Sequence, residues 1–392
     1  MSEAPLDGLK VLDLGQHIAA PYCAKLLATL GAEVIKIEPP AGGDPARRAG
    51  PFPDDLPHPE KSGLYLYLNT GKRGITLDLT STTGKQIFKE LVGWADVVVE
   101  NFSPQVLPSL GLGYEVLEQV NPRVVLTSIS NFGQTGPYRD SAAEEITLWA
   151  LGGLMYQAGL PEYPPLKFGP PVVQYSGGLS AFTATMMAVT YADLTGIGQQ
   201  VDVALLEVVA SNHFQSIVEY TYTGSVHQRN RAMMILPALD GWVSAPALAR
   251  HWVRFPDVIG MPELREDPRF ATELARRQNA DDLEAITIGW MADRTKEEIY
   301  RVGQSHHMPW SYVASVADLV NSPQYQARGF FAELDHPAAG KQLYPTLPMR
   351  IGDAPPVLGR APLLGEHNPQ VYGDLLGYSP ADLVRLRERG VI

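Results

Sequence analysis

Short runs of hydrophobic residues alternate with helix-spaced hydrophobic positions through the first part of the chain. Apolar runs at 10–14 and 33–38 predict strands, and the helical spacing at 20–31 predicts a helix between them. A further helix is expected at 82–93. Three later apolar runs also predict strands, at 74–80, 95–101 and 123–130. Such alternation is typical of an α/β fold with a doubly wound parallel sheet, whose ligand lies beyond the carboxyl ends of the strands.

The pattern changes after residue 150. The segment GPPVVQYSGG at 169–178 is rich in Gly and Pro, so it predicts a loop; it carries one amide side chain, Gln174, and no carboxylate. The apolar segment 179–194 predicts a helix with many small residues. The segment 199–224 predicts a strand that runs into a long helix.

Three parts of the chain differ in character. Residues 1–224 have the α/β pattern of a large domain, and residues 225–325 predict a smaller α+β domain. Within the latter, Asp-Gly between two strand-like runs at 238–248 indicates a hairpin. Residues 326–392 are Pro-rich and irregular until a final polar helix at 380–389. Long extended segments of this kind wrap another surface, within the chain or on a partner.

Composition narrows the class of protein. The chain has 392 residues, 45% of them hydrophobic, and a formal net charge of −12. A nucleic acid or an anionic membrane requires a basic footprint, so neither is an expected partner. The single cysteine, Cys23, fits a reducing compartment. There is no signal-peptide pattern at the N-terminus and no apolar run of about 18 residues, so a cytoplasmic location is expected.

A dinucleotide site is the tempting interpretation of the first strand–helix–strand unit, with Glu38 on the ribose. The sequence argues against it, because the first turn reads DLGQHIAAP at 13–21 and lacks the G-x-G-x-x-G fingerprint. The two glycines of TGIGQQ at 195–200 follow a predicted helix rather than a strand. Nicotinamide and flavin binding are therefore not expected.

Familiar catalytic and metal-binding motifs are absent. The sequence contains no H-E-x-x-H, no paired-cysteine spacing and no G-x-S-x-G. His306 and His307 are adjacent, so they would point apart and chelate poorly, and no metal site is predicted. In NTGKRG, Lys72 and Arg73 precede a strand and could bind phosphates, although a solvated charge pair is an equally good interpretation.

The chain resembles the family III CoA-transferases, also called the CaiB/BaiF family. The opening segment 5–47, PLDGLKVLDLGQHIAAPYCAKLLATLGAEVIKIEPPAGGDPAR, carries the resemblance first. Eight more segments continue it in order: 69–79, 95–104, 110–125, 128–138, 195–207, 261–270, 326–331 and 361–367. The resemblance therefore covers nearly the whole chain.

This resemblance implies a fold and a ligand that the hydrophobic pattern cannot reveal. Family members have a large Rossmann-like domain built from both chain ends, a small domain between them, and an interlocked dimer. The ligand is a coenzyme A thioester, and CoA passes between an acyl-CoA and a carboxylic acid. Carried onto this sequence, the CoA-binding residues are Ile18, Ala19, Asn69, Lys72, Arg73, Asn101, Phe102 and Phe132. Ser103 is a departure, because family members often have a basic residue there.

The family's mechanism rests on one aspartate, which attacks the donor thioester to form a mixed anhydride. Aligning the Gly-Pro-Pro turn and the small-residue helix that follows places that position at Gln174. No Asp or Glu occurs between Glu162 and Asp193, so a shift of register does not supply one. A neutral amide can hydrogen bond to a thioester carbonyl but cannot form the anhydride.

Three interpretations follow. The chain could be the CoA-binding, non-catalytic subunit of a heteromeric transferase whose homologous partner supplies the aspartate. It could instead be an isomerase or racemase acting on a CoA thioester, with Glu144 or Glu145 as base, although both could simply interact with a helix dipole. It could also be an acyl-CoA-binding regulatory protein. The acyl group cannot be named from the sequence. Four residues would suit a bulky acyl chain but could equally belong to the core: Trp149, Tyr156, Tyr163 and Phe168.

Overall fold

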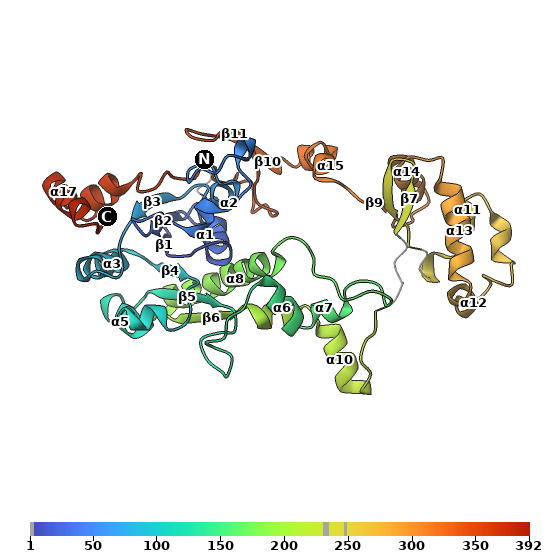
Figure 1. Cartoon of the computed structure of the whole chain (residues 1–392), viewed down its shortest axis with the longest axis horizontal. Helices are drawn as coiled ribbons and strands as arrows, with labels where there is room; N and C mark the ends of the chain where they lie inside the picture. The colour runs from blue at the N-terminus through green and yellow to red at the C-terminus, as the bar shows by residue number, and fades with distance from the viewer. Residues whose placement is uncertain (1–3, 230–234, 247–248) are drawn as a thin grey trace. The chain divides into compact units, whose positions relative to one another are not determined.

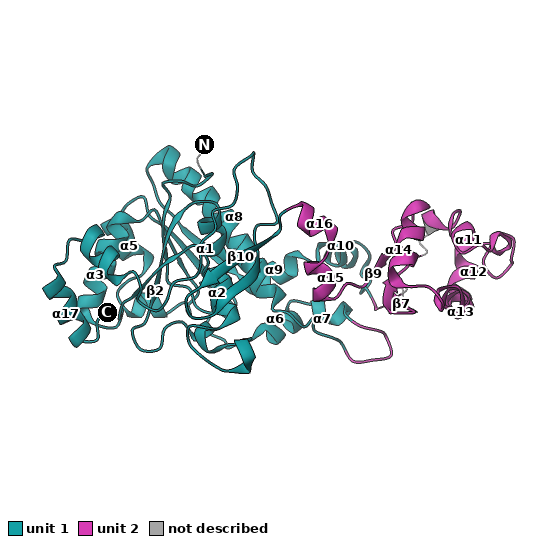
Figure 2. Cartoon of the chain, turned by 90° about the horizontal axis from the view of Figure 1, so that it is seen from above, with its two compact units in different colours: residues 1–158, 165–227, 329–392 teal, residues 159–164, 228–328 magenta. Residues whose placement is uncertain are grey.

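The chain folds into two compact units. The computed structural model describes residues 4–229, 235–246 and 249–392. The larger unit comprises Met1–Ala158, Pro165–His227 and Gly329–Ile392, and the smaller unit comprises Gly159–Pro164 and Gln228–Arg328 (Figure 2). The larger unit is thus built from both ends of the chain.

A six-stranded parallel sheet forms the centre of the larger unit (Figure 1). Its strand order is β3-β2-β1-β4-β5-β6, the doubly wound order in which direction reverses between β1 and β4. The strands are β1 (Lys10–Asp13), β2 (Glu33–Glu38), β3 (Arg73–Thr76), β4 (Val97–Glu100), β5 (Val125–Ser130) and β6 (Gln200–Ala204). The predicted α/β class with a parallel sheet is confirmed.

Helices cover both faces of this sheet. One face packs against α1 (Ala19–Thr29) and α8 (Val172–Thr195), and the other packs against α3 (Thr82–Trp94) and α5 (Tyr114–Val120) (Figure 1). The apolar strand residues are therefore buried from both sides, which explains their continuous hydrophobic runs. Among the described residues, no helix has the combination of length and apolar character that a membrane span needs.

The remaining helices of the larger unit are mostly short. They are α2 (Gly63–Leu68), α4 (Val106–Ser109), α6 (Glu145–Leu151), α7 (Leu154–Gln157), α9 (Leu205–Ser211), α10 (Phe214–Thr223) and α17 (Pro380–Glu388). The segment 199–224 thus forms a strand and two helices instead of a strand and one long helix, so that part of the prediction is wrong.

The loop prediction for 169–178 is also wrong beyond its first residues, because α8 begins at Val172. Gly177 and Gly178 lie inside the helix, where they permit close packing. A Cβ on Gly177 would lie 2.1 Å from Leu205 Cδ2, and a Cβ on Gly178 would lie 2.5 Å from the Ala19 carbonyl oxygen. Glycines that suggest a turn in the sequence are here the contact points between α8 and its neighbours.

The C-terminal segment packs against the edge strand β3. It begins with a hairpin, β10 (Phe331–His336) and β11 (Gly340–Pro345), which the sequence analysis missed. Further on, the Asn368 side-chain oxygen accepts a hydrogen bond from the Thr76 N–H at 2.9 Å. The Tyr372 hydroxyl donates to the Thr76 carbonyl at 2.6 Å. These bonds satisfy edge groups that would otherwise be open to another strand.

The smaller unit has its own sheet and core. Its antiparallel strands are β7 (Ile235–Ala238), β8 (Gly241–Ser244) and β9 (Ser311–Tyr312). Its helices are α11 (Phe255–Val258), α12 (Glu273–Gln278), α13 (Ala280–Met291), α14 (Lys296–Ser305), α15 (Val316–Val320) and α16 (Pro323–Ala327). The predicted hairpin is confirmed for β7 and β8, whereas residues 247–248 of that prediction lie outside the described residues.

A buried ionic cluster joins β2 to the segments around it. The Arg47 guanidinium donates to both carboxylate oxygens of Glu38, at 2.7 and 2.8 Å. It also donates to Tyr65 Oη at 2.6 Å and to the Pro362 carbonyl at 3.3 Å. The Arg47 and Glu38 side chains have no exposed surface. A buried carboxylate without a cation is unfavourable, so Glu38 keeps Arg47 in this position. Through its bond to the Pro362 carbonyl, Arg47 also links the C-terminal segment to the N-terminal half.

Replacing Arg47 with methionine removes the charge while keeping an unbranched side chain. We expect R47M to lower the free energy of unfolding by about 3 to 5 kcal/mol, because Glu38 is then buried without its cation. Urea denaturation followed by circular dichroism measures this. R123A is the control: it removes the exposed Arg123–Asp193 pair and should cost less than about 1 kcal/mol. Equal effects of the two variants would contradict the expectation.

Candidate functional site

The carboxyl edges of β1 and β4 form the ligand crevice expected of this sheet order. Asn101, directly after β4, bridges the two strands: its Oδ1 accepts from the Gln16 N–H at 2.7 Å, and its Nδ2 donates to the Gln16 carbonyl at 2.8 Å. Both halves of the Asn101 amide therefore fix the turn after β1. This explains why an amide stands at this position.

Side chains bind the other peptide groups of the same turn. The Gly15 N–H donates to Asp13 Oδ1 at 2.8 Å, and the His17 N–H donates to Asp44 Oδ1 at 3.0 Å. Buried Lys36 donates to the Gly15 carbonyl and to Asp44 Oδ2. Burial alone would lower the pKa of Lys36, but the Asp13 and Asp44 carboxylates outweigh it and raise that pKa. The N–H groups that a pyrophosphate would need in this turn are thus already bonded.

A small polar cavity of about 100 Å³ lies at this crevice. Four of the sequence-predicted site residues line it together: Ala19, Asn101, Phe102 and Gln174. The remaining lining residues are Ser103, Pro104, Ile129, Ser130, Asn131, Arg139, Ser141 and Leu205. Residues far apart in the sequence therefore meet here from α1, the segment after β4, β5 and the loop that follows it, α8 and α9.

Gln174 occupies the first turn of α8. Glu145 Oε1 caps this turn by accepting from the Val173 N–H at 2.9 Å, and it also accepts from Trp149 Nε1 at 3.1 Å. Among the described residues, the Gln174 N–H and its side-chain amide make no hydrogen bond. Gln174 thus presents free donors and an acceptor to the cavity at the positive end of a long helix.

Lys72 and Asn69 do not line the cavity, and Lys72 instead contacts the first turn of α1 at Pro21. The Lys72 ammonium donates to Asp13 Oδ2 at 2.7 Å, to Asn69 Oδ1 at 2.9 Å and to the Pro21 carbonyl at 2.9 Å. Burial lowers the pKa of Lys72 to about 8 against the opposing effect of Asp13. All three of its hydrogens are occupied, so the expected phosphate contact has no donor left on this side chain.

Arg73, Ile18 and Phe132 also lie outside the cavity lining. Arg73 starts β3 and forms an ion pair with Glu33. Ile18 is half-buried at the start of α1, next to Ala19. Phe132 follows β5 and packs its ring against that of Tyr138, with centroids 5.8 Å apart. The last two therefore border the crevice, whereas Arg73 belongs to the sheet edge.

Arg139 is the cation that the sequence analysis missed. It lines the small cavity together with Ser103, and both also line an adjoining cavity of about 260 Å³. Its Nε makes no hydrogen bond, although it lies 3.8 Å from Asp140 Oδ1 in a partly exposed ion pair. Ser130 Oγ, Gln134 Nε2 and Tyr114 Oη in the same region are buried without a hydrogen bond. Unpaired buried polar atoms gathered at one crevice are typical of a polar ligand site. A loop arginine has no periodic signal, so the sequence pattern could not single it out.

Comparison with known proteins identifies the chain. The sequence model of CoA-transferase family III matches residues 6–368. The chain belongs to CoA-transferase family III. It is 33% identical to succinyl-CoA–D-citramalate CoA-transferase of Chloroflexus aurantiacus, over 99% of this chain and 98% of that protein. It is 31% identical to the alpha subunit of succinyl-CoA–L-malate CoA-transferase of the same organism, over 100% of this chain and 93% of that subunit.

A solved structure supports the fold of this family member. The crystal structure of a CaiB/BaiF family protein from Brucella suis aligns with a TM-score of 0.86 at 31% identity, covering 95% of this chain and 100% of that one. The predicted resemblance is confirmed. Within the described part of this family III chain, no group of three His, Cys, Asp or Glu side chains is arranged to hold a metal ion.

Glu100 is a buried carboxyl group at the carboxyl end of β4 and lines the 260 Å³ cavity. Burial raises its pKa to about 7, although Ser128 and the Phe102 N–H, at 2.7 Å, favour the charged form. The folded protein therefore holds a proton on Glu100 that the unfolded chain has already released.

This shift predicts a pH dependence of stability. Between the ordinary pKa of glutamate and about 7, only the folded state keeps the Glu100 proton, so this group's contribution falls as the pH rises through that window. Glutamine carries no such proton, so the free energy of unfolding of E100Q should rise relative to that of the wild type as the pH is raised from 4.5 to 8. The expected rise is about 3 kcal/mol, because each unit of pKa shift corresponds to about 1.4 kcal/mol. Urea denaturation at several pH values measures it. The exposed Glu118→Gln control should show no such trend, and parallel curves for E100Q and wild type would contradict the assignment.

Proposed function

We propose that this chain is the CoA-thioester-binding, non-catalytic subunit of a family III CoA-transferase. The holoenzyme would move CoA between an acyl-CoA and a carboxylic acid. The observation that carries the proposal is Gln174, which lines a polar cavity with Ala19, Asn101 and Phe102 at the position where the resemblance expects a nucleophilic aspartate. A homologous partner would supply that aspartate.

The chemistry of the amide supports this assignment. The carboxylate of an aspartate can attack a thioester carbonyl, expel CoA and hold the acyl group as an anhydride. A carboxamide is neutral and a poor nucleophile, so no anhydride forms on it. The free N–H groups of Gln174 can still donate to a thioester carbonyl oxygen. This chain would therefore bind and orient the thioester without forming the covalent intermediate.

The CoA site that we propose differs from the site expected from the sequence in the cations that would bind the phosphates. Ile18, Ala19, Asn101, Phe102 and Phe132 remain as the residues along the pantetheine and adenine path. Arg139 takes the phosphate role, because it lies beside Ser103, where family members often carry a basic residue. Lys72 and Asn69 act instead as buried supports of the turn after β1. Arg73 is left as a secondary contact.

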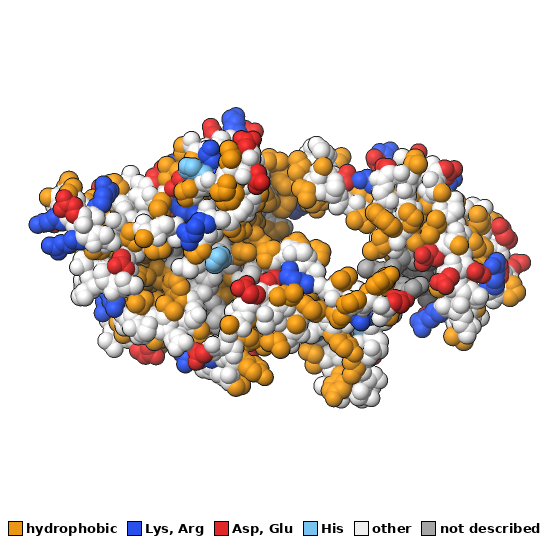
Figure 3. All heavy atoms as spheres, viewed as in Figure 1, with side chains coloured by type: hydrophobic (Ala, Val, Ile, Leu, Met, Phe, Trp, Pro, Cys, Tyr) orange, Lys and Arg blue, Asp and Glu red, His pale blue; other side chains and the backbone are white. Residues whose placement is uncertain are grey.

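Exposed apolar surface supports a partner subunit. In α10, Phe214 is 71% exposed and Tyr222 is 86% exposed, and in α8 Leu194 is 82% exposed. Figure 3 shows hydrophobic side chains gathered over α10. Surfaces of this kind mark protein interfaces, as an interlocked dimer would need. The L-malate enzyme of Chloroflexus aurantiacus has subunits named alpha and beta, both 31% identical to this chain. We infer a similar heteromer in the cytoplasm.

The isomerase or racemase alternative has less support. It needs a base close to the thioester, yet Glu145 Oε1 is engaged by the Val173 N–H and Trp149 Nε1. Through this oxygen Glu145 caps the first turn of α8, while its Oε2 is buried without a hydrogen bond. Glu144 is the N-cap of α6 and Glu145 is its first residue, which is the placement that the dipole interpretation describes. A regulatory acyl-CoA-binding protein would share the CoA site but lack a homologous partner, so copurification distinguishes it.

Covalent trapping tests the proposal directly. The purified chain should bind an acyl-CoA but form no enzyme-bound hydroxamate when hydroxylamine is added, because Gln174 cannot hold the acyl group. Q174D should form the hydroxamate, since the rest of the cavity is retained, and the matched Q174N control should not. Mass spectrometry of the intact chain reads out each variant. An acyl group trapped on the wild-type chain would refute the non-catalytic assignment.

The phosphate contact has its own test. A charge-assisted hydrogen bond of about 1.5 kcal/mol or more corresponds to roughly tenfold in affinity. We expect R139A to weaken CoA binding about tenfold, with a smaller effect at high salt. Isothermal titration calorimetry at two salt concentrations measures both quantities. R73A is the comparison, with an expected change below about threefold. The reverse order of the two effects would restore Arg73 to the principal role.

A further inference from the structure

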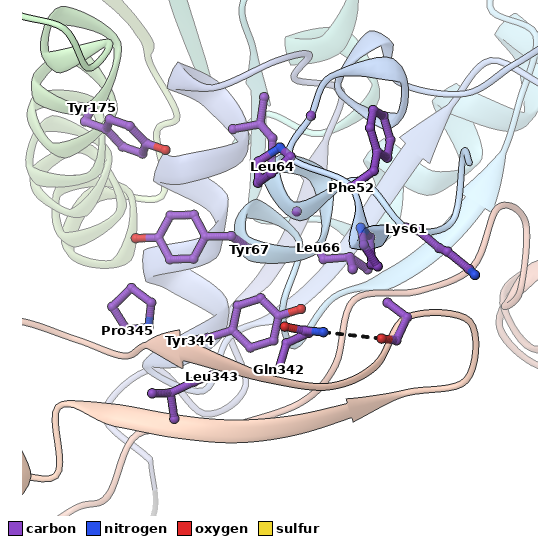
Figure 4. A pocket seen from close by; sticks show the side chains of 15 residues that line it. Phe52, Lys61, Leu64, Leu66, Tyr67, Tyr175, Gln342, Leu343, Tyr344 and Pro345 are labelled. Carbon is purple, nitrogen blue, oxygen red and sulfur yellow. Dashed lines mark hydrogen bonds between the residues drawn. The ribbon is translucent and has the colours of Figure 1, made fainter. Parts of the chain in front are cut away.

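A second cavity, larger and mostly apolar, lies on the other side of the first turn of α8. Its volume is about 530 Å³, within the usual range for small-molecule sites. It lies between the loop at 50–53, α2, α8 and β11 (Figure 4). The side chains that face it from these elements include Phe52, Leu64, Tyr67, Tyr175 and Tyr344.

Aromatic rings dominate one end of this cavity. The Tyr175 ring meets that of Tyr22 edge to face, with centroids 5.0 Å apart, and lies 6.4 Å from that of Tyr67. Burial raises the pKa of Tyr67 and of Tyr175, so their hydroxyl groups stay neutral. Edge-to-face geometry leaves ring faces free to contact a further ring.

Charge is almost absent from the lining. Lys61 is the one charged side chain among the lining residues of this described cavity, and Figure 4 shows it extending away from the three labelled tyrosines. A second lysine, Lys25, lies close by outside the lining: its Nζ is 4.8 Å from the centre of the Tyr67 ring and donates to Thr70 Oγ1 at 2.6 Å, and burial lowers its pKa to about 7. A carboxylate placed among these rings would lose its hydration and meet only a lysine that is already hydrogen-bonded and readily loses its charge, which is unfavourable. The cavity therefore suits an uncharged group.

The cavity adjoins the reaction centre through consecutive residues. Gln174 lines the small polar cavity and Tyr175 lines the apolar one, so the first turn of α8 separates the two. Any thioester whose carbonyl lies at Gln174 has its acyl group within reach of this turn. The polar cavity, at about 100 Å³, leaves little room for an acyl group beside pantetheine.

We propose that the apolar cavity holds the acyl group of the CoA thioester, and that this group is bulky, uncharged and aromatic. The inference rests on the proposed CoA-binding function and adds its substrate class. It sets this chain apart from relatives whose names specify succinate, malate or glutarate. A dicarboxylate would place its second carboxylate where the lining offers mainly rings and aliphatic side chains, with Lys61 directed away from the tyrosines.

Calorimetric titration of the purified full-length chain, alone or with its copurifying subunit, tests the inference. The probes are phenylacetyl-CoA, succinyl-CoA and CoA itself. We expect phenylacetyl-CoA to bind at least about tenfold more tightly than succinyl-CoA, since the phenyl ring buries apolar surface that the carboxylate cannot. If CoA binds but succinyl-CoA binds as tightly as phenylacetyl-CoA, the acyl class is wrong and the proposed function stands. If none of the three binds, both are wrong.

A charge placed in the lining gives the second readout. Leu64 is half-buried in the cavity wall, and L64R should reduce the preference for phenylacetyl-CoA at least fivefold while leaving the affinity for CoA unchanged. L56R is the matched control, because Leu56 is 67% exposed and lies outside the lining. An unchanged preference in folded L64R would refute the site. If L64R changes only the oligomeric mass, a second copy of the chain occupies the cavity and the inference is wrong.

Discussion

The turn after β1 depends on ionic contacts that are removed from water. Asp13 bonds to the Gly15 N–H and to Lys72, while Lys36 joins the Gly15 carbonyl to Asp44. Each charge in this group has a partner of opposite sign, which is the condition for stable burial. A glycine-rich turn would leave its N–H groups open to phosphates. Here the Gly15, Gln16 and His17 N–H groups are bonded to side chains, so they are not open to a phosphate.

This arrangement explains how two different cavities can flank one helix turn. The packing of α8 against α1 and α9 is close because Gly177 and Gly178 carry no Cβ. That packing directs Gln174 toward polar groups at the ends of β4 and β5. It directs Tyr175 toward the rings of Tyr22 and Tyr67. Neighbouring residues on a helix differ by about 100° in direction, so a single turn can serve both surfaces. In the complex that we propose, adjacent side chains of α8 would contact the polar part and the apolar part of one ligand.

The hydrophobic pattern was sufficient to predict the strands of the central sheet. Strands such as 33–38 are buried on both faces, so their apolar runs are continuous and hard to misinterpret. The pattern failed at Gly177 and Gly178, because local propensity associates glycine with turns while tertiary packing used it for close contact. The resemblance located Asn101, Phe102 and Gln174 at one cavity.

The role of the cations could not be predicted in the same way. Lys72 and Arg73 are adjacent in the sequence and look equally available, yet a lysine's environment is set by residues distant in the chain. Lys72 is enclosed by Asp13 and Pro21, whereas Arg73 reaches Glu33 at the sheet edge. Arg139 stands in an irregular loop, and only the folded chain brings it beside Ser103. Burial of a charged group follows from three-dimensional contacts, so no one-dimensional pattern contains it.

The position of the C-terminal segment has a consequence for biosynthesis. Thr76 is separated from its hydrogen-bond partners Asn368 and Tyr372 by 292 and 296 residues of the sequence. During translation, which proceeds from the N-terminus, the strand that contains Thr76 emerges long before those partners exist. The smaller unit is synthesised in the interval. The edge strand β3 therefore stays without these partners until the last part of the chain has been synthesised.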